Sequence, residues 1–173
     1  MPLSGRRIVL GVSGGVAAYK SVYLARRLGE AGAEVRVVMT EAATRFVGPA
    51  SFAAVTGHHP LTDLFSDESV SPHTDLARWA DLVIVAPATA ATLARLANGL
   101  SDEVLSATLL ATRAPVLVAP AMHTEMWEHP AVQENLAALK RRGVEVVPPE
   151  EGRLAGGDVG AGRLADPAVG AAQ

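Results

Sequence analysis

The sequence predicts an α/β fold in which helices cover both faces of a doubly wound parallel sheet. Short, nearly continuous apolar runs alternate along the chain with segments whose apolar residues recur at helical spacing. Turns that contain glycine or proline separate the two kinds of segment. Apolar strands that alternate with helices in this way are typical of parallel sheets buried on both faces.

Each element can be assigned in order along the chain. The expected strands cover residues 7–12, 34–39, 81–86, 114–119 and 144–147. The expected helices cover residues 16–30, 89–97, 103–112 and 130–142, with Gly32 and Gly143 as stop signals. The N-terminal order of strand, glycine turn, helix and strand is that of flavodoxin-like and Rossmann-like sheets. We therefore expect a single domain over residues 1–173.

Two regions do not follow this alternation. Residues 58–75 mix proline, aspartate and serine with His58, His59 and His73, which predicts an excursion over the surface. Residues 148–167 are rich in glycine, aspartate and arginine. That composition fits a mobile flap better than a core element.

Composition narrows the classes of function. A net charge of −3 without a basic stripe argues against nucleic acid as a partner. The chain has no cysteine, which excludes disulfides, thiolate metal sites and a cysteine nucleophile. No histidine and carboxylate spacing predicts a metal site. The apolar run after Arg6 and Arg7 is too short for a signal peptide or a membrane span, so we expect a cytoplasmic protein.

Ligand-binding residues are expected where strands end, because α/β sheets bind ligands outside the carboxyl ends of their strands. Residues 11–15 (GVSGG) join the first strand to the first helix. Backbone N–H groups at that helix start, with the Ser13 hydroxyl, would form a phosphate cradle favoured by the helix dipole. The spacing is neither a dinucleotide fingerprint nor a Walker loop, and a tight connection would also account for the glycines. Tyr19 and Lys20 are expected at the surface or in packing.

Three further segments each have two interpretations. Residues 87–92 (PATAAT) offer hydroxyls to the polar edge of a flat ring, although N-capping by Thr89 is the simpler explanation. Residues 120–127 (PAMHTEMW) predict a fixed loop, whose methionine and tryptophan side chains would ordinarily serve packing. His73 would ordinarily be a surface residue, although Asp75 is close enough in sequence to orient it.

Together these segments resemble the homo-oligomeric flavin-containing cysteine decarboxylases, which include phosphopantothenoylcysteine decarboxylases and peptidyl-cysteine decarboxylases. The resemblance covers residues 6–167 and keeps the family's order of motifs. GVSGGVAAYK is similar to the FMN-phosphate turn, and PHTDLARWAD places His73 at the active-site histidine. PATAAT resembles Pro-Ala-Ser-Ala-Asn-Thr, and PAMHTEMW resembles Pro-x-Met-Asn-x-x-Met-Trp. GRLAGGDVGAGRL resembles the flap that recognises the substrate.

The resemblance implies a role for each matched residue. His73 would be the base that helps to ionise the substrate thiol. FMN would be held by Ser13, Gly14, Gly15, Thr40, Pro87, Ala88, Thr89 and Met122. The substrate would be held by His123, Met126, Trp127 and Gly156, with residues 148–167 as the flap. The implied partners are a cysteine-containing substrate and further copies of the chain, as a homotrimer or a dodecamer of four trimers, without nucleic acid or membrane.

The implied chemistry is oxidative decarboxylation. FMN would accept a hydride equivalent from the Cα–Cβ unit of cysteine and leave a thioaldehyde. Because that group withdraws electrons from the neighbouring carbon, carbon dioxide can leave and an enethiolate remains. An acylated cysteine has no such electron sink without the cofactor.

Three positions depart from the family pattern. His123 stands where the family has an asparagine that contacts the substrate carboxylate, and a donor imidazole can serve the same purpose. Ala91 replaces the asparagine of the other motif. Gly156 replaces a flap cysteine that is associated with reducing the enethiolate to a saturated thiol. Peptide-modifying members need no such cysteine, because they release the enethiol.

The missing cysteine therefore favours a peptidyl-cysteine decarboxylase that acts on a C-terminal cysteine. The alternative is phosphopantothenoylcysteine decarboxylation, which makes pantetheine 4′-phosphate for coenzyme A. Bifunctional coenzyme A enzymes continue into a synthetase domain, whereas this sequence ends at Gln173. A flavin prenyltransferase would share the fold, but PAMHTEMW and His73 argue against it. A non-catalytic regulator of the halotolerance type would usually carry long acidic or disordered extensions, and this sequence shows none.

Overall fold

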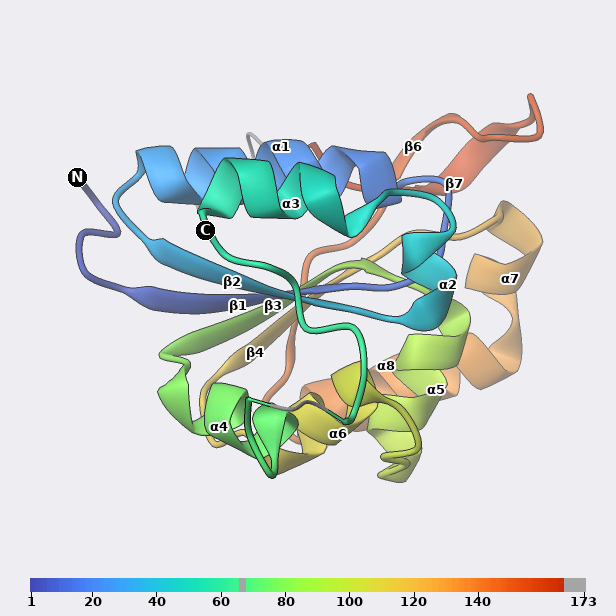
Figure 1. The fold of residues 1–173 in the computed structure, drawn as a ribbon. Coiled ribbons are helices and arrows are strands. Elements are labelled where there is room, and N and C mark those ends of the chain that lie inside the picture. Colours follow the sequence, from blue (N-terminus) through green and yellow to red (C-terminus); the bar gives the residue numbers. More distant parts are fainter. Residues whose placement is uncertain (66–67, 167–173) are drawn as a thin grey trace.

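The computed structural model describes residues 1–65 and 68–166 and confirms the predicted fold class (Figure 1). Five parallel strands form the central sheet in the order β2-β1-β3-β4-β5. They are β1 (Arg7–Val12), β2 (Glu34–Met39), β3 (Leu82–Ala88), β4 (Val116–Pro120) and β5 (Glu145–Val146). The strand order reverses between β1 and β3, which creates the switch point where sheets of this kind bind ligands.

Helices cover both faces of the sheet, with α1 and α3 on one face and α4, α5, α6 and α8 on the other (Figure 1). The larger helices are α1 (Ala18–Glu30), α3 (Pro49–Thr56), α4 (Pro72–Trp79), α5 (Ala90–Asn98), α6 (Val104–Ala111) and α8 (Pro130–Arg141). Two short helices, α2 (Glu41–Thr44) and α7 (Thr124–Glu128), lie near the carboxyl ends of the strands (Figure 1).

Strand β1 shows why the central part of a strand in this sheet is a continuous apolar run. Ile8 and Leu10 point into the core cluster that contains Leu28 of α1, whereas Val9 points into the cluster that contains Leu105 of α6. None of the three strand residues is more than 1% exposed. A strand covered on both faces has no solvent side to hold polar residues, so its sequence does not alternate.

Several boundaries differ from the prediction. Strands β1 and β2 have the predicted bounds, but Val16 and Ala17 form a turn before α1 begins at Ala18. Helices α2 and α3 were not predicted. The first is a single turn, and the second is apolar at most positions, so neither shows the helical spacing of apolar residues that identifies a surface helix.

Residues 58–75 are more structured than the predicted surface excursion. Leu61 forms an isolated parallel bridge with Val38 of β2, donating its N–H to Val37 O (2.8 Å) and accepting from Met39 N–H (2.9 Å). Helix α4 begins at Pro72, which puts the end of the region in a helix. The segment after β4 also differs from the predicted fixed loop, because it forms α7.

The predicted flap forms an antiparallel hairpin of β6 (Glu150–Arg153) and β7 (Val159–Arg163). The hairpin projects from the α1 side of the sheet (Figure 1). Leu164 and Ala165 follow it and are buried in the core cluster beneath α1. The expectation that the whole segment stays outside the core is therefore wrong, although the tip is exposed. The final flap position of the prediction, 167, lies outside the described residues.

Candidate functional site

Ser13 joins the carboxyl ends of β1 and β3 at the switch point. Its hydroxyl donates to Pro87 O (2.5 Å) and accepts from Thr89 N–H (3.0 Å). Only 1% of the residue is exposed, and its one hydroxyl proton is already donated. Ser13 therefore fixes the turn in this structure, and a contact between its hydroxyl and a phosphate stays a prediction.

Backbone N–H groups at the start of α1 form an anion cradle. Within the described residues, the amides of Gly14, Val16 and Ala17 donate to no protein acceptor. Gly14 has no room for a side chain, because a Cβ there would overlap Ala42 of α2. Bare backbone at this position allows close approach of a ligand, and the positive end of the α1 dipole favours a negative charge. The turn thus fits a phosphate group such as that of FMN.

Two threonines complete the ends of neighbouring strands. Thr40 caps α2 by accepting from Ala43 N–H (3.1 Å), and Thr89 caps α5 by accepting from Thr92 N–H (3.3 Å). The N-capping role that the sequence predicted for Thr89 is therefore confirmed. A Cβ on Gly15 would lie 3.8 Å from Thr89 Cγ2, so the two loops are in contact. The predicted FMN residues that meet at this edge of the sheet are Ser13, Gly14, Gly15, Thr40, Pro87, Ala88 and Thr89.

A pocket of 520 Å³ opens beside the cradle. Three parts of the chain line it: the start of α1 with Gly15 and Lys20, the segment after β4 with Met122 and His123, and the β6–β7 hairpin with Arg163. One predicted FMN residue, Met122, and one predicted substrate residue, His123, therefore share a pocket with the flap.

Two backbone carbonyls of the hairpin accept hydrogen bonds from the segment after β4. Met122 N–H donates to Gly162 O (2.9 Å), and the Thr124 hydroxyl donates to Ala161 O (2.6 Å). A Cβ on Gly162 would overlap Met122 O, and a Cβ on Gly160 would lie 2.5 Å from Thr124 Oγ1. The glycines of the flap therefore permit close contact with this segment.

His123 lies between two carboxylates at the edge of the pocket. Its Nδ1 contacts the Glu125 carboxylate, and its Nε2 lies 3.2 Å from Asp158 Oδ2 at the hairpin tip. The hydrogen bond to Glu125, with a further contribution from Asp158, raises the pKa of His123. The same contact contributes to lowering the pKa of Glu125, after a backbone hydrogen bond. An imidazolium at the edge of the pocket can attract a carboxylate.

Gly156 lies at the exposed tip of the hairpin, directly beside His123. A Cβ at Gly156 would be 3.9 Å from His123 Nε2 and 4.0 Å from Asp158 Oδ2, with nothing closer. The position therefore has space for a side chain. A thiol placed there would lie next to the imidazole.

Met126 and Trp127 are not part of the pocket lining. Met126 is 49% exposed on α7, and Trp127 packs against the core cluster on the α5–α8 side of the sheet. The ordinary packing interpretation therefore holds for Trp127. Within one chain, neither of these two predicted substrate residues joins His123 in lining the pocket.

His73 also lies away from this pocket. It is in the first turn of α4, on the face of the sheet opposite α1 (Figure 1), and it is absent from the pocket lining. Its Nδ1 is buried without a hydrogen-bond partner in the described part of the chain. Asp75 does not supply that partner, and its carboxylate accepts from the Ser69 hydroxyl instead. Buried polar atoms are nearly always hydrogen-bonded, so we expect the His73 ring nitrogen to bond with a group from outside the chain.

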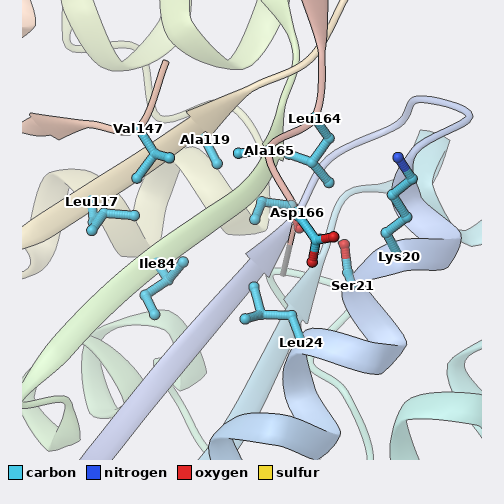
Figure 2. Close-up of a pocket in the computed structure, with 11 residues that line it drawn as sticks. Lys20, Ser21, Leu24, Ile84, Leu117, Ala119, Val147, Leu164, Ala165 and Asp166 are labelled. Atoms are coloured by element: carbon cyan, nitrogen blue, oxygen red, sulfur yellow. The ribbon is translucent and has the colours of Figure 1, made fainter. Parts of the chain in front are cut away.

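Lys20 is the site residue that sequence reasoning missed, because a lysine on a surface helix is usually solvated. Figure 2 shows it at the rim of a small apolar cavity of 30 Å³ between α1 and the sheet. Leu164 and Ala165 help to close this cavity, and the Lys20 amine extends away from its apolar walls (Figure 2). The same side chain, with Tyr19, lines the 520 Å³ pocket.

Two general findings concern the described part of the chain, residues 1–65 and 68–166. No group of three or more histidine, cysteine, aspartate or glutamate side chains there could hold a metal ion. No helix within those ranges has the length and apolar character needed to cross a membrane.

A parallel sheet with its switch point between β1 and β3, an amide cradle at that point and an adjoining pocket define a flavodoxin-like, mononucleotide-binding class of protein. The chain belongs to the flavoprotein family, whose model matches residues 2–168.

Known proteins similar to the chain carry related activities in their names. The coenzyme A biosynthesis bifunctional protein CoaBC of Mycobacterium tuberculosis is 56% identical over 159 residues, which are 92% of this chain and 38% of that protein. The chain thus spans well under half of the length of this curated relative. A cysteine-to-serine variant of a PPC decarboxylase, solved with pantothenoylaminoethenethiol, matches with a TM-score of 0.88 and 34% identity over 97% of this chain and 95% of the other. The FMN-dependent cysteine decarboxylase SpaF matches with a TM-score of 0.86 and 37% identity over 99% of both chains.

Proposed function

We propose that the chain is an FMN-dependent decarboxylase that acts on phosphopantothenoylcysteine and makes pantetheine 4′-phosphate. Its 56% identity to a coenzyme A biosynthesis protein supports this substrate more strongly than its 37% identity to SpaF supports another cysteine substrate. The comparisons therefore favour the alternative of the sequence analysis over the peptide substrate that the missing cysteine suggested.

The observation that carries the proposal is the arrangement at the switch point. The amides of Gly14, Val16 and Ala17 would hold the FMN phosphate, and the neighbouring pocket would hold the substrate beneath the hairpin. Bound FMN supplies the electron acceptor without which an acylated cysteine cannot lose carbon dioxide readily.

The protein's own contribution to the chemistry is to bind charge and move protons. The His123 imidazolium would hold the substrate carboxylate through Nε2, in exchange for its contact with Asp158. The same side chain would keep a proton on Nε2 beside Gly156, where related decarboxylases have a cysteine. We infer that His123 provides the proton for the saturated thiol, so that a chain without cysteine can still complete the reaction. His73 would ionise the substrate thiol.

The test is a product analysis with purified, FMN-loaded protein. We expect phosphopantothenoylcysteine to lose carbon dioxide alone, in air and without oxygen, because the electrons taken up in the first half of the reaction return in the second. Mass spectrometry and oxygen uptake measure both quantities. A peptide ending in cysteine is the matched substrate. Preferential turnover of that peptide, with loss of two further hydrogens and consumption of oxygen, would contradict the proposal. It would support the hypothesis that the substrate is a peptide with a C-terminal cysteine.

The remaining expectations belong to the same proposal. A homotrimer, or a dodecamer of four trimers, would supply a second chain to each flavin. The scarcity of aromatic residues, 4% of the chain, supports this, because one small domain then has little with which to cover an isoalloxazine ring. A cytoplasmic location accords with coenzyme A synthesis.

A further inference from the structure

Two cations gather at the base of the hairpin, where it leaves the sheet. Lys20 comes from α1 and Arg163 from the end of β7, and both line the 520 Å³ pocket. Within the described part of the chain, neither of them forms an ion pair. The His123 charge, by contrast, is already matched by Glu125 and Asp158.

The surroundings of Lys20 disfavour its charge in the absence of an anion. Burial and the positive charge of Arg163 lower the pKa of Lys20, while Glu150 and Asp166 oppose this with smaller effects. Glu150 is itself engaged, because its carboxylate accepts from Asp166 N–H (3.2 Å). A bound anion would relieve the repulsion between Lys20 and Arg163 and stabilise both charges.

The His123 ring reaches the tip of the hairpin, although the His123 backbone lies against Gly162, next to Arg163. Arg163 lies opposite Glu150 in the register of the two strands at the base of the hairpin, whereas the His123 ring contacts Asp158 at the tip. Arg163 comes five positions after Asp158 in the sequence, which corresponds to about 16 Å between their backbones along an extended strand. The pocket can therefore accept an elongated molecule with its reactive group at the tip and a negative group at the base.

A second groove continues from the cationic end. It has a volume of 530 Å³, runs beside α1 towards Arg27, and shares Tyr19, Lys20 and Arg163 with the first pocket. Lys20 and Arg163 thus line both hollows, and Glu30 and Asp166 also line the second. Arginine and lysine are the side chains that most often bind phosphate, the first through paired N–H groups and the second as a point charge.

We propose that Lys20 and Arg163 form a subsite for the phosphate monoester of the substrate, which fixes an elongated acyl-cysteine with its cysteine end at His123. This inference rests on the proposed function and adds a residue basis for choosing phosphorylated over unphosphorylated substrates. The FMN phosphate is the other source of such a group, and we assign it to the amide cradle at Gly14.

The test measures the binding of two ligands that differ only in the phosphate, pantetheine 4′-phosphate and pantetheine, to FMN-loaded protein by calorimetry. The wild-type protein should bind the phosphorylated ligand more tightly. Lys20→Met should reduce this preference about tenfold to a hundredfold, the range for a lost hydrogen bond to a charged group. Lys20→Arg should restore most of it, and Lys140→Met on the exposed surface of α8 is the matched control.

The outcomes separate the subsite from the proposed function. A protein that decarboxylates phosphopantothenoylcysteine but binds both ligands equally has no such subsite. A protein that prefers the phosphorylated ligand without decarboxylating it has the subsite but another function. Loss of flavin from Lys20→Met, read from the flavin absorbance of the purified variant, would show instead that these cations bind the FMN phosphate. An unaltered preference in Lys20→Met also overturns the proposal.

Discussion

His123 and Gly156 are neighbours in space, and both differ from the residues that the family motifs have at these positions. An imidazole faces the place where a cysteine side chain would project, with 3.9 Å between Nε2 and a Cβ at Gly156. The family asparagine is absent at His123, and the family cysteine is absent at Gly156. Because the two positions are adjacent, the proton of His123 could take the place of the missing thiol proton. This pairing is visible only when the hairpin is folded back onto the segment after β4.

Replacing His123 by asparagine, the residue of the family motif, should change the product. Without a proton at Nε2, His123→Asn should release the enethiol and consume oxygen, which mass spectrometry and an oxygen electrode detect. The double variant His123→Asn/Gly156→Cys regains both family residues and should again give the saturated thiol. Val159→Ala, at a side chain of the same hairpin that is 79% exposed, is the control for altered flap structure. A saturated product from His123→Asn alone would refute the assignment.

The contact between His123 and the hairpin should weaken as the pH rises. Because the folded-state pKa of His123 is raised, its ion pairs are complete below the ordinary histidine pKa of about 6.5 and are lost as the pH passes through the higher, folded value. Hydrogen exchange of the hairpin amides should therefore be slower in the wild type than in His123→Asn at low pH. The ratio of the two rates should approach one at high pH. A ratio that does not vary with pH would exclude this latch.

At the scale of elements, the turn into α1 combines a sharp change of chain direction with an anion cradle. Ser13 bonds it to β3, and Gly14 brings its backbone against α2. The sequence predicted the phosphate turn because glycines followed a buried strand before a helix. It could not predict that the Ser13 hydroxyl turns inwards, since that depends on Pro87 O, which is far away along the chain.

Gly14→Ala should displace α2 and disturb the cradle. The added methyl group would overlap the Ala42 side chain and lie 2.9 Å from its backbone carbon, so we expect a loss of about 1–3 kcal/mol in unfolding free energy and weaker FMN retention. Gly29→Ala in the same helix region is the matched control. Its methyl group would meet nothing within 4 Å, and it should stabilise the protein by about 0.5–1 kcal/mol. Thermal unfolding measures the change in stability, and flavin absorbance measures FMN retention. Full flavin content in Gly14→Ala would contradict the assignment of the FMN phosphate to the amide cradle.

The whole molecule separates two groups of predicted site residues on opposite faces of one sheet. The amide cradle, His123 and the hairpin lie towards α1, whereas His73 lies in α4 with α6 (Figure 1). Thus, if His73 serves the reaction, it most simply does so in the pocket of a second copy. Its buried Nδ1 without a partner fits a contact that a single chain does not make.

Mixed oligomers should show which chain supplies His73. His73→Asn should lose about 10²–10⁴-fold in turnover and keep its flavin, as expected for a lost general base. Co-expressed with Gly14→Ala, it should recover part of the activity, because some sites then combine an intact cradle with an intact histidine. Activity assays on the co-purified oligomer measure this. Each variant alone is the control, and a mixture no better than the sum of its parts would place His73 and the cradle in the same chain.

The sequence predicted the sheet better than the assembly of the pocket. Strands β1 and β2 were found at their predicted bounds, the first because it is an apolar run that ends at a glycine turn and the second because its residues alternate after a helix stop. The residues after the strands were expected to meet because parallel strands share a carboxyl edge. The meeting of Lys20 with Arg163 has no such rule behind it. It depends on a hairpin whose residues show no periodic pattern and whose end at Leu164 is fixed by core packing.

The anchoring of the hairpin bears on how this protein can evolve. Leu164 and Ala165 are held in the hydrophobic core, whereas a Cβ added at Gly156 would come no closer than 3.9 Å to any other group. Mutations at the tip therefore change what faces the pocket while leaving the buried residues that maintain the fold intact. Selection can alter substrate choice there at little thermodynamic risk, so relatives with nearly superimposable sheets can diverge in the cysteine compounds that they accept.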